Sequence, residues 1–267
     1  MNVAGDPRAN ANLLIVEIGN SHVAVATSVQ HQIRTHERFG HDELEKMADY
    51  SQQAWAALPD RRLKALVAGS VVPKVLEEVR GRLCERLGVP MSVVGSDLHR
   101  PILLAVEEPD AVGADRVCAA AAAYDQIRGA CVIASFGTAV TIDCVNDEGV
   151  FMGGAILPGL ALQAKALHFG TARLPEVKIK ETGAVYGAST SEAICNGIIY
   201  GIAGALREIT ERYATDLKAW PRLVVTGGGA ELIHKQCDFI DNLVPDLCVR
   251  GIDLAYQKHF SSFDEAT

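Results

Sequence analysis

The chain has 267 residues, which suits one large domain or two lobes of ordinary size. Hydrophobic residues make up 49% and charged residues 22%, a composition that favours a packed core and excludes wholesale disorder. The formal net charge is -8, whereas DNA- and RNA-binding proteins usually carry an excess of basic residues, so no nucleic-acid partner is expected. An anionic ligand such as ATP would need local hydrogen-bond donors, because the net negative charge of the protein repels it.

The cysteines and the start of the chain bear on location. Seven cysteines, an odd number, occur without any Cys-x-x-Cys pair, which argues against a disulfide framework and a zinc site. Residues 1–11 are expected to be a loose tail, not a signal peptide, and no run of about 18 apolar residues predicts a membrane span. We therefore expect a cytoplasmic protein.

The predicted elements alternate between strand and helix along the chain. The first half reads as a strand–turn–strand unit (13–29), a helix (41–58), a strand that runs into a helix (65–87), a short strand (91–94) and a stretch (112–127) that becomes helical after Gly113. The second half reads as another strand–turn–strand unit (132–145), a hairpin turn (146–149), a bend into a helix (153–167), a long helix (189–213), a strand, glycine turn and helix (222–233) and a last helix (251–260).

The strand–turn–strand unit occurs twice. "IVEIGNSHVAV" (15–25) and "IASFGTAVTID" (133–143) both give an apolar strand, a polar residue, one apolar residue, a glycine, two small residues and a second strand. This repeat predicts an α/β fold of two related lobes with a cleft between them. We place the N-terminal lobe at residues 12–127 and the C-terminal lobe at residues 128–260.

Three glycine turns follow predicted strands and are candidates for phosphate binding. A glycine after a buried strand lets backbone N–H groups approach an anion, and Asn20, Ser21 and Thr138 add short polar side chains. A carboxylate beside such a turn, as Glu17 is, can hold a cation that offsets the charge of a triphosphate. The alternative for any single turn is a tight hairpin, and the turn at 226–229, taken alone, is better explained as the start of a helix.

The stretch "GADR" (113–116) lies at the start of an alanine-rich helix. One interpretation is structural, because the helix dipole favours Asp115 in the first turn. The other is functional: Arg116 would bind a substrate carboxylate and Asp115 would take a proton from a substrate hydroxyl. Composition does not choose between them.

Several stretches in order resemble the type III pantothenate kinases. They are "EIGNSHVAVA", "SVVP", "VGADRVCAAAAAY", "FGTAVTID", "GGAILPGL", "ARLPEV", "GASTSEAICNGIIYG" and "VVTGGGAEL", and they span about residues 13 to 260. The resemblance implies two duplicated ribonuclease H-like lobes of the actin-like ATPase, sugar kinase and Hsp70 fold. It also implies that ATP and Mg²⁺ are used to phosphorylate the 4′-hydroxyl of pantothenate, the first step of coenzyme A biosynthesis, in a homodimer.

Carried over position by position, the resemblance implies a set of site residues. Asp115 would be the proton acceptor. Pantothenate would be bound by Gly113, Ala114, Asp115, Arg116 and Thr190, with Thr190 at a dimer interface. ATP would be bound by Glu17, Ile18, Gly19, Asn20, Ser21, His22, Val23, Ala24, Thr138, Gly227 and Gly228.

Three positions depart from the family pattern. Glu17 replaces an Asp, which shifts any indirect contact with Mg²⁺. Ser135 replaces an Asp that binds K⁺ or NH₄⁺, and Val106 replaces a Tyr that contacts pantothenate. We therefore expect activity that is independent of K⁺ or only weakly stimulated by it. Two alternatives stay open: a weak or inactive accessory protein that binds ligand, and a kinase of this fold for another small hydroxyl substrate.

Overall fold

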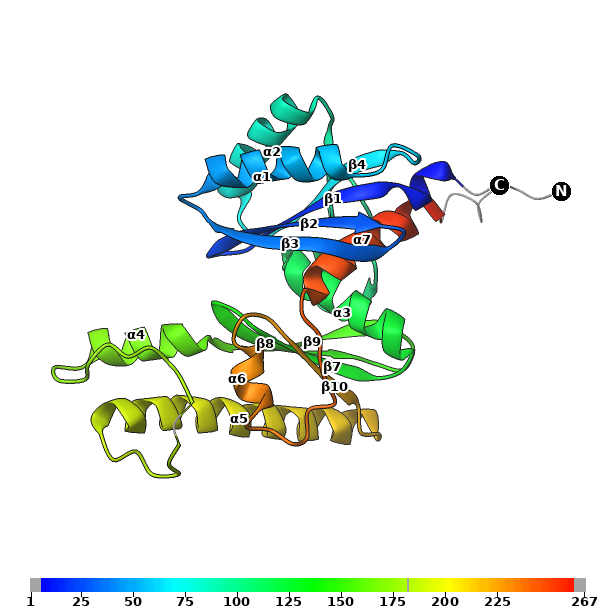
Figure 1. Cartoon of the computed structure of the whole chain (residues 1–267). Helices are drawn as coiled ribbons and strands as arrows, with labels where there is room; N and C mark the ends of the chain where they lie inside the picture. Colours follow the sequence, from blue (N-terminus) through cyan, green and yellow to red (C-terminus); the bar gives the residue numbers. More distant parts are fainter. Residues whose placement is uncertain (1–5, 182, 262–267) are drawn as a thin grey trace. The chain divides into compact units, whose positions relative to one another are not determined.

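The computed structural model of the chain describes residues 6–181 and 183–261 (Figure 1). The chain forms two compact units. The first comprises residues up to Leu103, Glu107–Ala122 and the chain from Leu247 onward, and the second comprises Leu104–Val106 and Ala123–Asp246. These ranges differ from the expected 12–127 and 128–260 chiefly because the last helix packs on the first sheet.

The first unit is built on a five-stranded sheet in the order β3-β2-β1-β4-β5. The strands are β1 (Asn12–Ile18), β2 (His22–Val29), β3 (Gln32–Gly40), β4 (Lys64–Ser70) and β5 (Met91–Val93). β1, β2 and β3 are antiparallel neighbours, and β4 and β5 continue parallel to β1. The β1–β2 hairpin and the parallel strands were expected, whereas β3 was not.

The second unit repeats this arrangement in a six-stranded sheet in the order β11-β10-β7-β8-β9-β6. The strands are β6 (Leu103–Leu104), β7 (Cys131–Phe136), β8 (Ala139–Val145), β9 (Val150–Pro158), β10 (Arg222–Thr226) and β11 (Asn242–Leu243). β7, β8 and β9 are antiparallel, and β10 and β11 continue parallel to β7. Apart from β6, which has no counterpart, the order and direction of the strands match those of the first sheet, so the expected fold of two duplicated α/β lobes is confirmed.

Helices cover both faces of the first sheet (Figure 1). α1 (Leu44–Ala57) and α2 (Pro73–Leu87) pack on one face, where Val16, Val25, Met47 and Leu83 belong to one apolar cluster. α7 (Leu247–Ser261) packs on the other face, where Ile252 joins Leu13, Ile15 and Cys118 of α3 (Ala114–Ile127). The alternating side chains of β1 therefore face two separate cores, as expected for a central strand covered on both sides.

The helices of the second unit are α4 (Leu160–Gly170), α5 (Thr190–Leu217) and α6 (Ala230–His234). α5 begins with a capping box. Glu192 N–H donates to Ser189 Oγ, and Ser189 N–H donates to the Glu192 carboxylate, both at 3.2 Å. α5 and α6 contribute to the apolar core on the second sheet through residues such as Leu206 and Ile233.

The start of the described chain is more ordered than expected. Pro7–Asn10 form a short 3₁₀ helix, η1, capped by the carboxylate of Asp6, which accepts from Arg8 N–H at 2.8 Å. The Arg8 guanidinium lies 4.5 Å from the centre of the Phe260 ring in α7. This stretch is therefore attached to the last helix, and the expectation of a loose tail was wrong for residues 7–10. The other short 3₁₀ helix, η2 (Pro109–Ala111), precedes α3.

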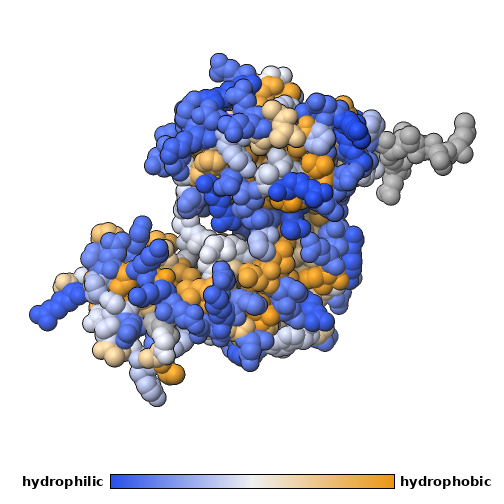
Figure 2. Space-filling view, in the orientation of Figure 1, coloured by the Kyte–Doolittle hydropathy of each residue, from blue (hydrophilic) through white to orange (hydrophobic). Residues whose placement is uncertain are grey.

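On the visible surface, hydrophilic residues predominate and apolar patches interrupt them in both units (Figure 2). Within the described residues, no helix has the length and hydropathy needed to cross a membrane. All seven cysteines are free thiols, and six of them are buried.

Candidate active site

Two carboxylates lie close enough in the first unit to influence each other. Glu17 is the one polar side chain near the end of β1, and Asp115 lies in the first turn of α3. Burial raises the pKa of Glu17, the Arg38 charge opposes this shift, and the negative charge of Asp115 adds to it. Both residues were predicted for the site, and the structure brings them together.

Asp115 is held in a defined position at the beginning of α3. The Arg116 N–H donates to Asp115 Oδ1 at 2.8 Å. A Cβ atom on Gly113 would lie 2.5 Å from the same oxygen, so a larger residue there would displace the carboxylate from this position. Burial raises the pKa of Asp115, opposed by the Arg116 N–H and the Arg116 charge. A carboxylate with a raised pKa is a stronger proton acceptor than an ordinary one, which suits a general base.

The first glycine turn joins β1 to β2. Gly19 N–H donates to the His22 carbonyl at 3.0 Å, and Asn20 and Ser21 form an exposed bend. Ile18, Val23 and Ala24 were also predicted to bind ATP, but their side chains are buried. These three residues could therefore contact a ligand only through their backbone atoms, unless the side chains packed on the sheet rearranged.

The second glycine turn joins β7 to β8 and carries Thr138. Gly137 N–H donates to the Ala139 carbonyl, and Gly159 N–H donates to the Thr138 carbonyl, both at 3.0 Å. The second contact fixes the turn against the bend that precedes α4. Thr138 therefore lies on a rigid support, as a phosphate-binding side chain requires.

Ser135 precedes this turn and lies in a row of hydroxyl residues. Its register partners are Thr141 in β8 and Thr226 in β10. A row of neutral hydroxyls offers oxygen atoms but no carboxylate, which is a poor fit to a tightly bound cation. Among the described residues, no group of three or more His, Cys, Asp or Glu side chains could hold a metal ion.

The third glycine turn joins β10 to α6, beside the second. Gly227 has φ of 93°, and a Cβ atom there would lie 2.7 Å from the Phe136 carbonyl oxygen. Gly229 N–H donates to that same oxygen at 3.1 Å. Because β7 and β10 are parallel neighbours, their carboxyl ends place both turns at one edge of the sheet.

A cavity of about 920 Å³ opens beside these two turns within the second unit. Its lining includes Gly137, Gly228 and Gly229 from the turns, Leu160 from α4 and Leu232 from α6. Gly228 was predicted for the ATP site and lines the cavity, whereas Thr138 and Gly227 are not among the lining residues.

The charged lining of this cavity was not predicted. It comprises four lysines and three glutamates, a formal excess of one positive charge: Lys165, Lys178, Lys180, Lys235, Glu176, Glu181 and Glu231. The Lys235 ammonium pairs with the Glu231 carboxylate at 3.0 Å. The sequence signal for part of this lining was the alternation of lysines in "VKIK" (177–180).

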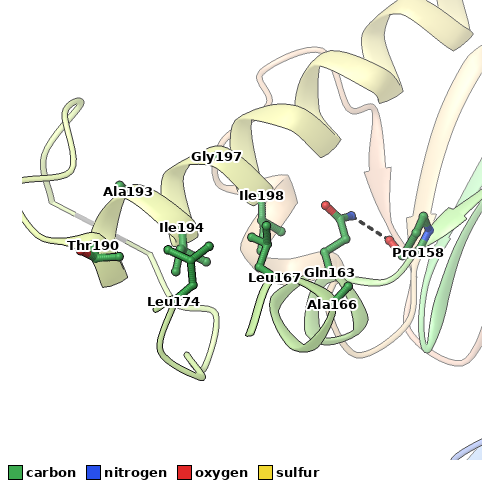
Figure 3. A pocket seen from close by; sticks show the side chains of 10 residues that line it. All are labelled: Pro158, Gln163, Ala166, Leu167, Leu174, Thr190, Ala193, Ile194, Gly197 and Ile198. Atoms are coloured by element: carbon green, nitrogen blue, oxygen red, sulfur yellow. Dashed lines mark hydrogen bonds between the residues drawn. The ribbon is translucent and has the colours of Figure 1, made fainter. Parts of the chain in front are cut away.

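Thr190 lies at a second cavity of the second unit, of about 640 Å³ (Figure 3). Leu167, Leu174, Ile194 and Ile198 give this cavity apolar walls from α4, α5 and the connection between them. Thr190 lies at one end. At the other, Gln163 Nε2 donates to the Pro158 carbonyl at 2.8 Å.

The remaining predicted residues are distributed over the two units. Ala114 begins α3 and Arg116 follows Asp115, so the whole stretch 113–116 belongs to the first unit. Val106 belongs to the second unit and faces Gly153 of β9, where a Cβ atom would lie 3.4 Å from Val106 Cγ1. Its side chain therefore packs on the sheet as an ordinary apolar residue.

Comparisons with known proteins give one family and solved structures of similar fold. The family model described as type III pantothenate kinase matches residues 13–212. A conserved Baf family protein from Campylobacter jejuni is similar at 18% identity and a TM-score of 0.60, over 95% of this chain and 100% of that one. The ethanolamine utilization protein EutJ from Carboxydothermus hydrogenoformans is similar at 13% identity and a TM-score of 0.54, over 94% and 92%.

Proposed function

Because the chain belongs to the type III pantothenate kinase family, we propose that it transfers the γ-phosphate of ATP to the 4′-hydroxyl of pantothenate. The observation that carries the proposal is Asp115. Its carboxylate is partly buried at the start of α3, fixed above Gly113 and next to the charge of Glu17. That environment suits a base that removes a proton from an alcohol.

In this reaction Asp115 accepts the proton of the 4′-hydroxyl. The hydroxyl oxygen forms a bond to the γ-phosphorus, the bond from that phosphorus to the β–γ bridging oxygen breaks, and ADP leaves. The transition state for such transfers is loose, so positioning and charge neutralisation contribute most of the rate. Arg116, next to Asp115, would bind the carboxylate of pantothenate.

The nucleotide would be held by the turns. In the first unit, Asn20 and Ser21 of the exposed β1–β2 bend would contact phosphate oxygens. In the second unit, the candidate nucleotide contacts are Thr138 and the cavity beside Gly228, with its excess of one positive charge. Backbone N–H groups at glycine turns and lysine ammonium groups are both suited to a polyanion.

Mg²⁺ would neutralise part of the charge on the transferred phosphate. The described residues fit a metal held mainly by ATP oxygens, because Glu17 and Asp115 supply two carboxylates and no larger cluster exists there. The hydroxyl row around Ser135 does not fit a tightly bound K⁺. We accordingly propose turnover without a K⁺ requirement.

A second copy of the chain would cover the apolar end of the second unit. Phe169 is 78% exposed near the end of α4, and Thr190 lies at the rim of the apolar cavity that α4 and α5 line. Covering this surface would place Thr190 in an interface, as the family resemblance implies.

Two observations favour a second function, ligand binding without efficient turnover. Burial raises the pKa of Glu17, and the row containing Ser135 offers no charge to assist phosphate transfer. A protein that binds ATP or pantothenate in an accessory role would keep the turns and the α3 stretch but would need neither an ionised Glu17 nor a charge at position 135.

The testing experiment measures ADP release by the purified protein with ATP and Mg²⁺, with and without pantothenate. Each condition is run in KCl and in choline chloride at equal ionic strength. We expect pantothenate-dependent ADP release that changes less than twofold between the two salts. Nucleotide binding without pantothenate-dependent release would favour the accessory function. Release that depends on another alcohol would show a different acceptor.

A further inference from the structure

A histidine beyond β3 reaches the first glycine turn from outside the hairpin. His41 Nε2 lies 3.0 Å from the carbonyl oxygen of Gly19, which is 22 positions earlier in the chain. A carbonyl oxygen only accepts, so Nε2 carries the proton and donates. The contact is partly buried and was not part of the predicted site.

The backbone around His41 is itself closed by two hydrogen bonds. Glu43 N–H donates to the Gly40 carbonyl at 3.0 Å, and Gly40 N–H donates to Glu43 Oε2 at 3.2 Å. Gly40 is the register partner of His22, the first residue of β2 (Figure 1 shows β3 beside β2). The imidazole is therefore presented to the turn from a fixed support at the edge of the same sheet.

The bonded carbonyl determines where the next N–H points. The Gly19 C=O and the Asn20 N–H belong to one planar trans peptide, so they point in opposite directions. With the C=O on His41, the Asn20 N–H is directed away from His41. Within the described residues Asn20 makes no hydrogen bond, and its side chain is exposed. Flipping this peptide would turn a phosphate donor into a carbonyl that repels phosphate.

We infer that His41 is a positioning residue for the nucleotide, holding the Gly19–Asn20 peptide so that its N–H faces the terminal phosphates of a nucleoside triphosphate. The inference rests on the proposed function for the identity of the ligand. The role assigned to His41 needs no direct contact with either substrate. It acts through Gly19, and the turn's other link, from Gly19 N–H to the His22 carbonyl, remains when His41 is replaced.

Two substitutions separate the hydrogen bond from the bulk of the ring. His41→Leu removes the donor and puts an apolar side chain of similar size in its place. His41→Gln keeps an N–H donor at about the same distance from the backbone. His99→Leu is the matched control, because His99 lies beyond β5, at the opposite edge of the sheet, with its ring centre 4.8 Å from that of His259. Each variant is titrated with Mg²⁺ and a non-hydrolysable ATP analogue by calorimetry.

We expect His41→Leu to weaken binding of the analogue about five- to tenfold, the loss typical of one hydrogen bond. His41→Gln should restore it to within about threefold, and His99→Leu should match the parent protein. The KM for ATP should rise in His41→Leu while the KM for pantothenate stays constant. A merely structural role would affect both substrates and would not be rescued by glutamine.

A second readout needs no ligand. Exchange of the Gly19 amide hydrogen, followed by NMR, should be faster in His41→Leu than in the parent protein and His41→Gln, because the turn opens more often. Equal exchange in all variants would overturn the inference. If the parent protein binds no nucleotide at all, the proposed function fails and the phosphate role of His41 falls with it. If the parent protein binds nucleotide but does not phosphorylate pantothenate, the calorimetric comparison of the His41 variants still tests the inference.

Discussion

At the scale of single residues, the burial of Asp115 makes its carboxylate a stronger base but lowers the stability of the fold at neutral pH. Burial raises its pKa, so in the folded protein the carboxyl binds a proton more tightly than in the unfolded chain. Its favourable contribution to stability is therefore complete at pH values below the unfolded pKa, near 3.8, and is lost as pH rises through the folded pKa. At neutral pH the ionised carboxylate destabilises the fold that holds it.

Asp115→Asn should consequently lower kcat by about 10²-fold or more while raising stability at pH 7. Asparagine removes the buried charge but keeps an oxygen for the Arg116 N–H. We expect the free energy of unfolding in urea to rise by about 1 kcal/mol at pH 7, and the gain to shrink toward pH 4. Near-normal turnover would remove Asp115 from the role of base, and a gain that grows at low pH would contradict its raised pKa.

At the scale of elements, the turn between β10 and α6 depends on Gly227. Its positive φ is strained for any other residue, and an added Cβ would meet three backbone atoms of Phe136 at 2.7 to 2.9 Å. Gly227→Ala should therefore move the β10–α6 turn away from the β7–β8 turn. We expect urea unfolding to show a loss of about 1–3 kcal/mol in the free energy of unfolding. Calorimetry should show that the substitution lowers the affinity for nucleotide more than the affinity for pantothenate.

Gly204→Ala is the matched control for that substitution. Gly204 lies inside α5 with nothing within 4 Å of an added Cβ, so alanine should stabilise the helix by about 1 kcal/mol. A destabilised Gly204→Ala would show that alanine is harmful at glycines generally. An unaffected Gly227→Ala would show that the turn tolerates a side chain and does not set the cavity.

The elements that the sequence predicted are those with a strong local pattern. The two hairpins, the parallel strands and the α3 stretch carry buried apolar runs or turn residues, and each formed. β3 escaped prediction because "QIRTHERFG" is polar, as an edge strand with one face exposed can be. The site was predictable only where it lies on those elements.

What the sequence could not predict depends on distant pairs. The contact of His41 with Gly19 and the charged lining at Lys178 and Lys235 join residues far apart in the chain. No local periodicity encodes such contacts. The family pattern located Glu17 and Asp115, but their mutual effect on pKa follows from burial, which only the fold determines.

At the scale of the whole molecule, the last helix completes the first unit. Val249, Ile252 and Ala255 of α7 are fully buried against residues of β1 and α3. Ending the chain before Leu247 should therefore unfold the first unit and leave the second with its own sheet and core. Limited proteolysis should then yield a resistant fragment from within residues 123–246, and calorimetry should show a smaller unfolding enthalpy.

Gly251→Ala tests the same dependence without shortening the chain. An added Cβ would overlap the carbonyl oxygen of Cys118, so α7 must move away from α3. We expect the stability of the first unit to lie between that of the parent protein and that of the truncated protein, so that protease cleaves the first unit more easily than in the parent protein. Full resistance of the first unit in the truncated protein would show that α7 is an accessory element and not part of the core.

The stacking of Arg8 on Phe260 has a consequence for rearranging the chain. It places the two ends of the described chain side by side on one unit. A short flexible linker could join them, with new ends opened at the exposed connection near Ala219 between α5 and β10. Such a circular permutant would keep every strand neighbour of both sheets while making η1, β1 and α7 consecutive in sequence. The first unit would then be synthesised as one uninterrupted segment apart from the strand at Leu104.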